Sequence, residues 1–427
     1  MITELSRRRL ITVKVQDGEE VLSIHRSLQE KILQDLDKDP KKREEVFFQA
    51  FGLVRKRFPL PSPIQVPTPE KWPACREYLP HVLNIQKIVI DTLPSIAPSV
   101  KVAQLLSDGG INLWERGMTN EGLRLLRSAE AVLKKIDSHE GQLEANIHII
   151  IALLLQDYGL SNVAESKERI WKALQVRKDH VRLTKPELRT RNQDILLHNA
   201  WSDYGCVLLQ YNNYQEAEPI FRQCLTKYRE WGTEAEIPYE YYKYNHHTAF
   251  CRLYHKDFAT AIALAEEGLR CITLATGQSS ATNKTKFDLA CILLQSGDLQ
   301  RSLDLHREVL ESRLKQHGKF SFLTLQSHYA LGALYAYSGE LAEAEYVPFI
   351  LSSNYVSFPD PTDQRQPETL SVRLLNPPPL APAAGPKPPL HERNSISRRS
   401  SFSKRKIWKK RRSWQLGPER SWQGCYR

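Results

Sequence analysis

Apolar residues recur every three or four positions through most of residues 100–345, a block that contains almost no proline. This period is typical of amphipathic helices and predicts a long helical array. Nearer the amino terminus, β-branched runs at 10–15 and 21–25 flank Asp17-Gly18 and predict a β-hairpin. Helical spacing returns at 28–36 and 44–57, and the prolines that follow predict an extended connector.

The helical block repeats itself. A small residue recurs in the first half of each second helix, at Gly122, Ser166, Ala217, Ala261, Ser302 and Ala344. The spacings are 44, 51, 44, 41 and 42 residues, which predicts a stacked array of about six helix pairs. Pro348 falls within the second helix of the sixth unit, so we expect that helix to be short or absent.

These units resemble the tetratricopeptide repeat. The third unit carries Trp201, Gly205, Ala217 and Phe221 at the large, small, small and large signature positions of that family. Three other units match it through Gly110, Gly117, Leu126 and Ala129, through Leu289, Ala290 and Gly297, and through Leu331, Gly332, Tyr335, Gly339 and Ala344. Small residues let two helices approach closely, and a turn glycine adopts a backbone conformation that side chains oppose.

The second and fourth units match least, with Leu154 at a small position and Lys256 in the turn. Spacings near 42 residues are similar to those of kinesin-light-chain repeats, longer than the usual period of about 34. The resemblance implies an all-α fold, a right-handed tetratricopeptide solenoid.

The order of the segments resembles fungal-type NB-ARC/tetratricopeptide proteins, nucleotide-switched sensors of the NOD-like kind. In those proteins a winged-helix domain is joined to the repeats by a segment similar to the amino-terminal part of this chain, and the resemblance covers residues 3–345. It implies that the hairpin and helix are a winged-helix remnant and that the ATPase module would lie before Met1. The chain would then be the sensor half of such a receptor.

Five segments follow from these patterns. We expect a winged-helix remnant with a connecting helix at 1–58, a proline-rich linker and the first helix of the array at 59–98, and the repeats at 99–350. A proline-rich disordered linker at 351–392 and a basic disordered tail at 393–427 would complete the chain.

The net charge of +11 belongs to the tail. Residues 393–427 hold twelve Lys and Arg against Glu419, which leaves the preceding 392 residues neutral. An argument for nucleic acid or anionic lipid must therefore rest on the tail. Its basic residues, at Lys404, Arg405, Lys406, Lys409, Lys410, Arg411 and Arg412, resemble a nuclear-import signal or a nucleic-acid arm. The abrupt change in composition also fits translation of a mispredicted exon.

Catalytic and cofactor motifs are missing from the sequence. It has no GxSxG, HExxH or GxGxxG, and at Gly277 Thr282 replaces the second glycine of a phosphate loop. The seven cysteines form neither a disulfide framework nor a zinc module. Adjacent helical residues point about 100 degrees apart, so His246 and His247 favour packing over a shared metal. We expect no enzyme activity, no cofactor and no metal.

A partner would bind the first helices of the repeats, whose non-core positions line the concave face. Alignment with the repeat family places there Asn199, Ser202, Asp203, Lys243, His246, His247, Lys284, Asp288, Gln326 and Tyr329. Their mixed polar and aromatic character favours a protein or peptide, although an ordinary solvated face would have the same composition.

We therefore expect a non-catalytic protein- or peptide-binding scaffold. The alternative is a nuclear or nucleic-acid-associated adaptor that acts through its basic tail. No apolar run approaches the roughly 18 to 20 residues of a membrane span, and no secretory signal begins the chain. These features favour the cytoplasm or the nucleus.

Overall fold

A computed structural model describes residues 10–16, 19–91, 96–136, 141–156 and 162–340, together with Glu4, Arg7 and Arg8. The chain divides into two compact units, Met1–Thr285 and Lys286–Arg427. The basic tail, the proline-rich linker before it, Ala344 and Pro348 lie outside the described residues.

The predicted hairpin is present. Strands β1 (Ile11–Gln16) and β2 (Glu19–Ile24) pair antiparallel, with Ile11 opposite Ile24. Helix α2 (Arg26–Leu36) follows at once, as its apolar period predicts, and the His25 side chain accepts a hydrogen bond from the Ser27 amide at its start. That this hairpin and helix derive from a winged helix stays a prediction.

Helix α3 (Pro40–Arg57) begins four residues before the position predicted from the apolar period, because Asp39 caps the Lys42 amide and Pro40 occupies the first turn, where no amide donor is needed. Its last turn is tied to α5 (Val100–Glu115) by an ion pair of 2.5 Å between Arg55 and the buried Asp108. The helix is thereby fixed to the first repeat.

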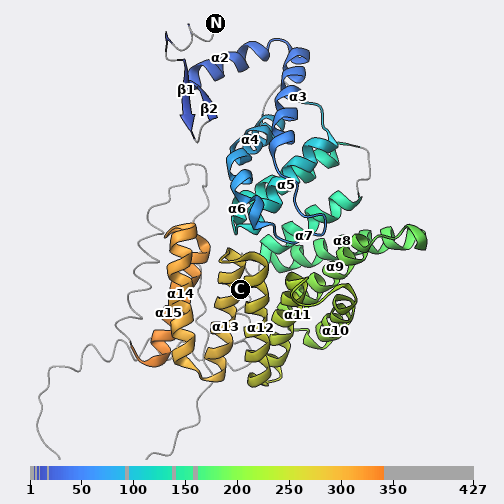
Figure 1. Cartoon of the computed structure of the whole chain (residues 1–427), viewed down its shortest axis with the longest axis vertical. Helices are drawn as coiled ribbons and strands as arrows, with labels where there is room; N and C mark the ends of the chain where they lie inside the picture. Colours follow the sequence, from blue (N-terminus) through green and yellow to red (C-terminus); the bar gives the residue numbers. More distant parts are fainter. Residues whose placement is uncertain are drawn as a thin grey trace, which may run out of the picture. The chain divides into compact units, whose positions relative to one another are not determined.

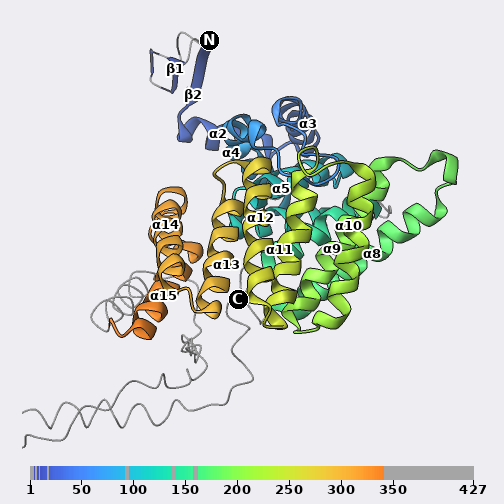
Figure 2. The same cartoon turned by 60° about the horizontal axis from the view of Figure 1, so that its bottom comes forward.

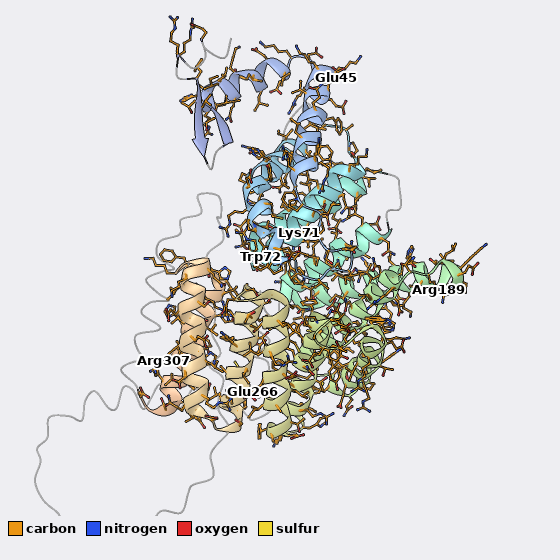
Figure 3. The ribbon with its side chains drawn as sticks, in the orientation of Figure 1. Glu45, Lys71, Trp72, Arg189, Glu266 and Arg307 are labelled. Carbon is orange, nitrogen blue, oxygen red and sulfur yellow. The ribbon has the colours of Figure 1, made fainter. Side chains whose placement is uncertain are left out.

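The segment between α3 and α4 (Trp72–Asp91) is extended apart from a turn at residues 63–64, where the Gln65 amide donates to the Ser62 carbonyl, and the short helix η1 (Pro69–Lys71). Glu115 of α5 accepts hydrogen bonds from Trp72 Nε1 at 2.6 Å and from the Thr68 amide at 3.1 Å, which fixes the entry into α4. Figure 3 labels Lys71 and Trp72 at this junction. The predicted connector therefore packs along the repeats.

Consecutive helices then form antiparallel pairs (Figures 1 and 2). The first unit holds α5 with α6 (Thr119–Lys134), α7 (Gly141–Gln156) with α8 (Val163–Leu183), α9 (Arg191–Gln210) with α10 (Tyr214–Trp231), and α11 (Pro238–Tyr254) with α12 (Phe258–Thr276). One turn, η3 (Pro186–Leu188), separates α8 from α9. Helix α13 (Ser280–Ser296) spans the boundary, and α14 (Leu299–His317) and α15 (Phe322–Ser338) belong to the second unit.

The small residues that define the repeat lie where the sequence predicts. Gly122, Ser166, Ala217, Ala261 and Ser302 all fall in second helices and are buried. Two of them also join the helices of their pair, because Ser166 donates a hydrogen bond to the Ala152 carbonyl and Ser302 to that of Ala290. The all-α repeat fold is therefore confirmed, including the weakly matching second and fourth units.

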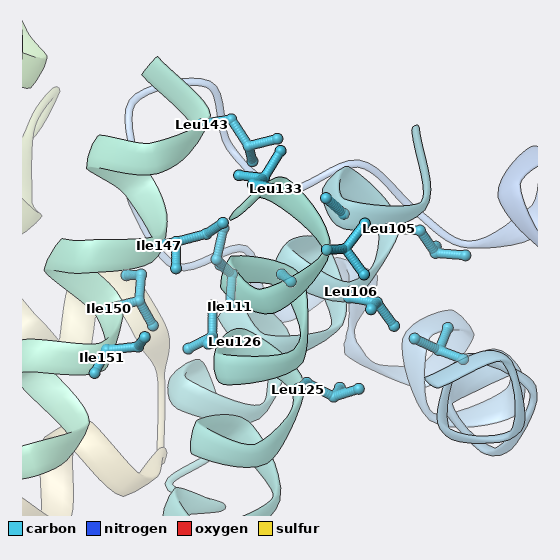
Figure 4. Close-up of a cluster of buried hydrophobic side chains, with 14 of the residues drawn as sticks. Leu105, Leu106, Ile111, Leu125, Leu126, Leu133, Leu143, Ile147, Ile150 and Ile151 are labelled. Atoms are coloured by element: carbon cyan, nitrogen blue, oxygen red, sulfur yellow. The ribbon is translucent and has the colours of Figure 1, made fainter. Parts of the chain in front are cut away.

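Apolar side chains fill the space between neighbouring pairs. Figure 4 shows part of the largest cluster, in which Leu105 and Leu106 of α5 meet Leu125 and Leu126 of α6 and residues of α7 such as Ile150. All five are fully buried. Each such side chain contributes about 1.5 to 3 kcal/mol when removed from water, so this stacking supplies much of the stability of the array.

Candidate functional site

Six of the ten predicted partner-binding residues lie on α9 and α11. Asn199, Ser202 and Asp203 come from α9, and Lys243, His246 and His247 come from α11. The sequence placed them at non-core positions, but the structure buries all six. The reason is that α9 packs against α10 and α11, and α11 also packs against α10 and α12.

Three of these residues meet in one buried network. Lys243 Nζ lies 2.5 Å from Asp203 Oδ1 and also donates a hydrogen bond to the Asn199 carbonyl at 3.2 Å. The Tyr228 hydroxyl donates to Asn199 Oδ1 at 3.3 Å. A charge out of contact with water is tolerated only when it is paired and hydrogen-bonded. This network is therefore a structural link between α9, α10 and α11.

Glu240 adds a second buried carboxylate to this region. Burial raises its pKa, while Lys243 and a hydrogen bond from Asn199 act in the opposite direction. Its Oε1 atom has no hydrogen-bond partner. Burial likewise holds the pKa of His247 well below its usual value, aided by His246 and Lys243. Burial thus shifts both groups toward their neutral forms and closes them to solvent.

The two histidines pack against aromatic rings. The His246 ring lies 5.2 Å from that of Tyr242 and 5.3 Å from that of Phe250, and the His247 ring lies 5.1 Å from that of Phe221. This arrangement supports the packing interpretation of the pair.

The other four predicted residues are spread over two units. Lys284 is half-buried in the first turns of α13. Asp288 is buried in the second unit, where Gln326 accepts a hydrogen bond from Arg313 and the hydroxyl of Tyr329 is buried without a partner. Binding of a partner by any of the ten stays a prediction. The basic residues of the tail lie outside the described part of the chain.

An exposed aromatic surface on α8 and α9 escaped the sequence interpretation. Three pairs connect α8 with α9 and the residue that caps it: Lys167 with Tyr211 just after α9, Trp171 with Tyr204, and Lys178 with Trp201. The Trp171 and Tyr204 ring centroids are 5.3 Å apart, and each lysine ammonium lies within 5.5 Å of its ring centroid. Trp171 and Tyr211 are each 44% exposed. The aromatic spacing was visible in the sequence, but Trp201 was assigned to the repeat signature alone.

A cavity of about 950 Å³ that no sequence pattern predicted opens between α4 and α6. Its described lining is Leu83, Asn84, Gln86, Lys87 and Ile90 from α4, Asn120, Leu123, Arg124, Arg127, Ser128 and Ala131 from α6, and Leu155 and Asn162. We call it the α4–α6 groove. It combines an apolar floor with amide and cationic side chains.

One group of metal-ligand types lies close together among the described residues, namely Glu234, Glu267 and Cys271. Arg270 forms ion pairs with both carboxylates, and burial raises the pKa of the Cys271 thiol. Arg270 offsets one of the two carboxylate charges, and the raised pKa keeps the Cys271 thiol protonated, which disfavours it as a metal ligand.

Within the described part of the chain, no helix is both long and apolar enough to cross a bilayer.

Comparison with known proteins finds no matching family model and no matching curated protein. Solved structures with similar folds are helical-repeat proteins. One is a putative kinesin light chain with tetratricopeptide-like repeats from Podospora anserina, with 17% identity, 52% of this chain and 100% of that chain covered, and a TM-score of 0.37. Another is the quorum sensor NprR in its apo form from B. thuringiensis. It has 12% identity and a TM-score of 0.44, and the match covers 76% of this chain and 93% of that one.

A third similar structure is a signal transduction ATPase with numerous domains and a tetratricopeptide repeat sensor, from Pyrococcus horikoshii. It has 13% identity and a TM-score of 0.45, and the match covers 83% of this chain and 45% of that one. Similarity at such low identity and TM-score assigns no ligand to this chain. The evidence for the repeat fold is the set of helix pairs described above.

Proposed function

We propose that the chain is a non-catalytic repeat scaffold that binds a protein or peptide, as the sensor part of an NB-ARC-type receptor would. The observation that carries this proposal is the aromatic surface on α8 and α9. Large, partly exposed aromatic side chains on rigid helices provide binding energy at low entropic cost, and Trp and Tyr dominate the hot spots of protein interfaces.

The geometry of the surface favours a ligand over simple solvent exposure. Trp171 is 44% exposed although the surrounding helices bury most of their apolar side chains. Lys167 and Lys178 rest on neighbouring rings, which holds the rings in place through cation–π attraction. A rigid aromatic platform of this kind matches apolar or proline-containing peptide segments.

A binding role also fits the buried polar groups. Catalysis requires a nucleophile or base that a substrate can reach. Glu240 and His247 are instead enclosed, and burial shifts their pKa values toward the neutral forms. We expect no ATP hydrolysis by this chain alone, and measured turnover would contradict the non-catalytic part of the proposal.

Selection from a random displayed peptide library against the full chain tests the proposal. We expect the selected peptides to bind saturably in calorimetry. Trp171→Ala should reduce their affinity by about tenfold, because one hot-spot contact is lost. Leu53→Ala is the control, because Leu53 is 71% exposed on α3 and should leave the affinity unchanged. Failure to select any saturable peptide, or equal binding by Trp171→Ala, would refute the proposed surface.

The basic tail supports an alternative function as a nucleic-acid-associated adaptor. Residues 393–427 carry a net charge of +11, and phosphate contacts make such binding strongly dependent on salt. Salt-sensitive binding of a single-stranded oligonucleotide that disappears when 393–427 are deleted would favour this alternative.

A further inference from the structure

Hydrogen bonds between α4 and α6 connect the two walls of the α4–α6 groove. Gln86 of α4 donates hydrogen bonds from Nε2 to Ser128 Oγ at 2.9 Å and to the Arg124 carbonyl at 3.5 Å. Ser128 Oγ in turn donates to the Arg124 carbonyl at 2.8 Å. These bonds fix α4 at one distance from α6. The walls of the groove are therefore preorganised, which lowers the entropic cost of binding.

Cations line both walls. Lys87 projects from α4, and Arg124 and Arg127 project from α6. No aspartate or glutamate occurs among the described residues of the lining. A groove with one sign of charge raises the local concentration of ligands of the opposite sign.

The cations of α6 have few close carboxylate partners. Arg124 forms no ion pair with a side chain that the structure describes. Arg127 lies 3.7 Å from Glu165, a carboxylate that Arg169 binds more closely, at 2.7 Å. The described lining of the groove thus holds three cations and no carboxylate.

The floor of the groove is apolar. Leu123 and Leu155 are buried beneath it, Leu83 is half-buried, and Ile90 at the margin is 39% exposed. A ligand that fits must offer an apolar side chain to the floor and negative charge to both rims. No aromatic residue is present in the described lining, so the groove lacks the rings on which nucleic-acid bases stack.

We propose that the α4–α6 groove binds an acidic segment of a partner protein, in which carboxylates flank an apolar side chain. The carboxylates contact Lys87, Arg124 and Arg127, and the apolar side chain covers Leu83 and Leu123. Amide side chains such as Asn84 provide hydrogen bonds to the peptide backbone. This site lies on other helices than the aromatic surface and does not depend on it.

The volume and charge arrangement favour a peptide over a small anion. A space of about 950 Å³ is far larger than a phosphate needs. Lys87, Arg124 and Arg127 are all exposed, so they surround the cavity without converging on one buried point. Charges spread along two helical walls match a ligand whose own charges are spread along a chain.

Fluorescence anisotropy with a labelled peptide tests the proposal on the full chain. The probe is a peptide of glutamates and aspartates that flank two leucines, and its reference has glutamine and asparagine at the acidic positions. We expect the acidic probe to bind about tenfold more tightly, and its binding to weaken as salt is raised. The double variant Lys87→Glu/Arg124→Glu should reduce affinity for the acidic probe by about tenfold or more, because it replaces attraction by repulsion on both walls.

Lys101→Glu is the matched control. Lys101 is an exposed lysine of α5 that is absent from the groove lining, so this variant is compared with Lys87→Glu alone, which makes the same charge reversal within the groove. The affinity of Lys101→Glu for the acidic probe should equal that of the wild type. Circular dichroism of all variants shows whether the fold is kept. Leu83→Gln leaves the cations in place and should weaken binding of the acidic probe through the loss of an apolar contact at the floor alone.

Three results would overturn the proposal. They are equal binding of the acidic and amide peptides, an unchanged affinity in the double variant, and displacement of the probe by inorganic phosphate or a single-stranded oligonucleotide at comparable anion concentration. Trp171→Ala, measured in parallel, separates the two sites. Loss of acidic-probe binding in Trp171→Ala but not in the groove variant would place that peptide on the aromatic surface instead.

Discussion

Gly205 of α9 lies against the ring of Phe221 in α10, so closely that a Cβ atom at Gly205 would lie 2.6 Å from Cε1 of that ring. Gly110 and Leu126 repeat this relationship in the first helix pair, where the same atom would lie 2.5 Å from Leu126 Cγ. Both glycines are helical. These positions therefore need glycine because the neighbouring helix leaves no room for a side chain, and not because of their backbone conformation.

Gly205→Ala should destabilise the protein by about 1 to 3 kcal/mol, because the Phe221 ring must leave its position to admit a methyl group. Urea unfolding followed by circular dichroism measures this as a lower midpoint. Gly52→Ala is the control: nothing lies within 4 Å of its added Cβ in α3, so helix propensity should raise stability by up to about 1 kcal/mol. A similar change in both variants would disprove the packing explanation.

Lys256 occupies the turn between α11 and α12 with a left-handed backbone, at φ of 60 degrees. Glycines hold the equivalent turns at Gly117, Gly297 and Gly339, with φ between 70 and 91 degrees. A side chain in this conformation costs about 1 kcal/mol relative to glycine. Lys256→Gly should therefore raise the free energy of unfolding by about that amount, measured by urea denaturation.

The reverse substitution provides the check on this turn. Gly297→Ala should lower stability by about 1 kcal/mol through the backbone alone, since an added Cβ there meets no atom within 4 Å. If Lys256→Gly were neutral while Gly297→Ala destabilised, the left-handed strain at Lys256 would be offset by contacts of its own side chain.

Sequence alone predicted the repeat because its rule is local. Residues such as Gly122, Ala217 and Ser302 must be small wherever two helices of a pair cross, and all three are buried at such crossings. Lys256 made the fourth unit look irregular, yet α11 and α12 form a complete pair. Packing of the apolar faces supplied enough stability to tolerate an unfavourable turn residue.

The candidate site could not be predicted in the same way. Asp203 and Lys243 are polar, and a polar residue in a helix usually faces solvent, but here each neutralises the other within the core. Hydropathy does not distinguish these two cases. The α4–α6 groove depends on the contact of Gln86 with Ser128, 42 residues later, and no local pattern specifies such a contact.

Arg177 and Arg313 occupy the same place in different repeats. Each follows the small residue of its second helix by eleven positions, from 166 to 177 and from 302 to 313. Both are buried, and each donates from Nη1 to a carbonyl of the next helix, that of Leu196 or Leu323. The guanidinium thus joins one repeat to the next.

Arg177→Met should lower the free energy of unfolding by about 2 to 4 kcal/mol. Arg177 also donates to Gln65 Oε1 at 2.7 Å and to Asn146 Oδ1 at 3.1 Å, so the variant leaves buried acceptors unpaired. Burial lowers the pKa of Arg177 only to about 10, and the group stays charged at neutral pH. Arg229→Met, at an exposed position of α10, should change the urea midpoint little. Equal effects of the two variants would show that the buried hydrogen bonds contribute nothing.

His306 should make the second unit sensitive to acid. The residue is 1% exposed and packs edge-on against Phe287, with ring centroids 4.9 Å apart. Burial, together with the charge of Arg313, lowers its pKa from 6.5 to about 4, while Asp288 acts in the opposite direction. The folded protein therefore keeps the imidazole neutral at a pH where the unfolded chain protonates it.

The sign of the effect follows from this difference. Above about pH 6.5 neither state holds the proton, and the histidine does not make stability depend on pH. As the pH falls toward 4 the unfolded state binds a proton that the folded state refuses, so stability should decline by an amount on the order of 3 kcal/mol. His306→Gln removes this titration. As the pH falls from about 7 to about 4, the free energy of unfolding of the variant should therefore rise relative to that of the wild type. A difference between His306→Gln and the wild type that stayed constant with pH would show that His306 is not the titrating group.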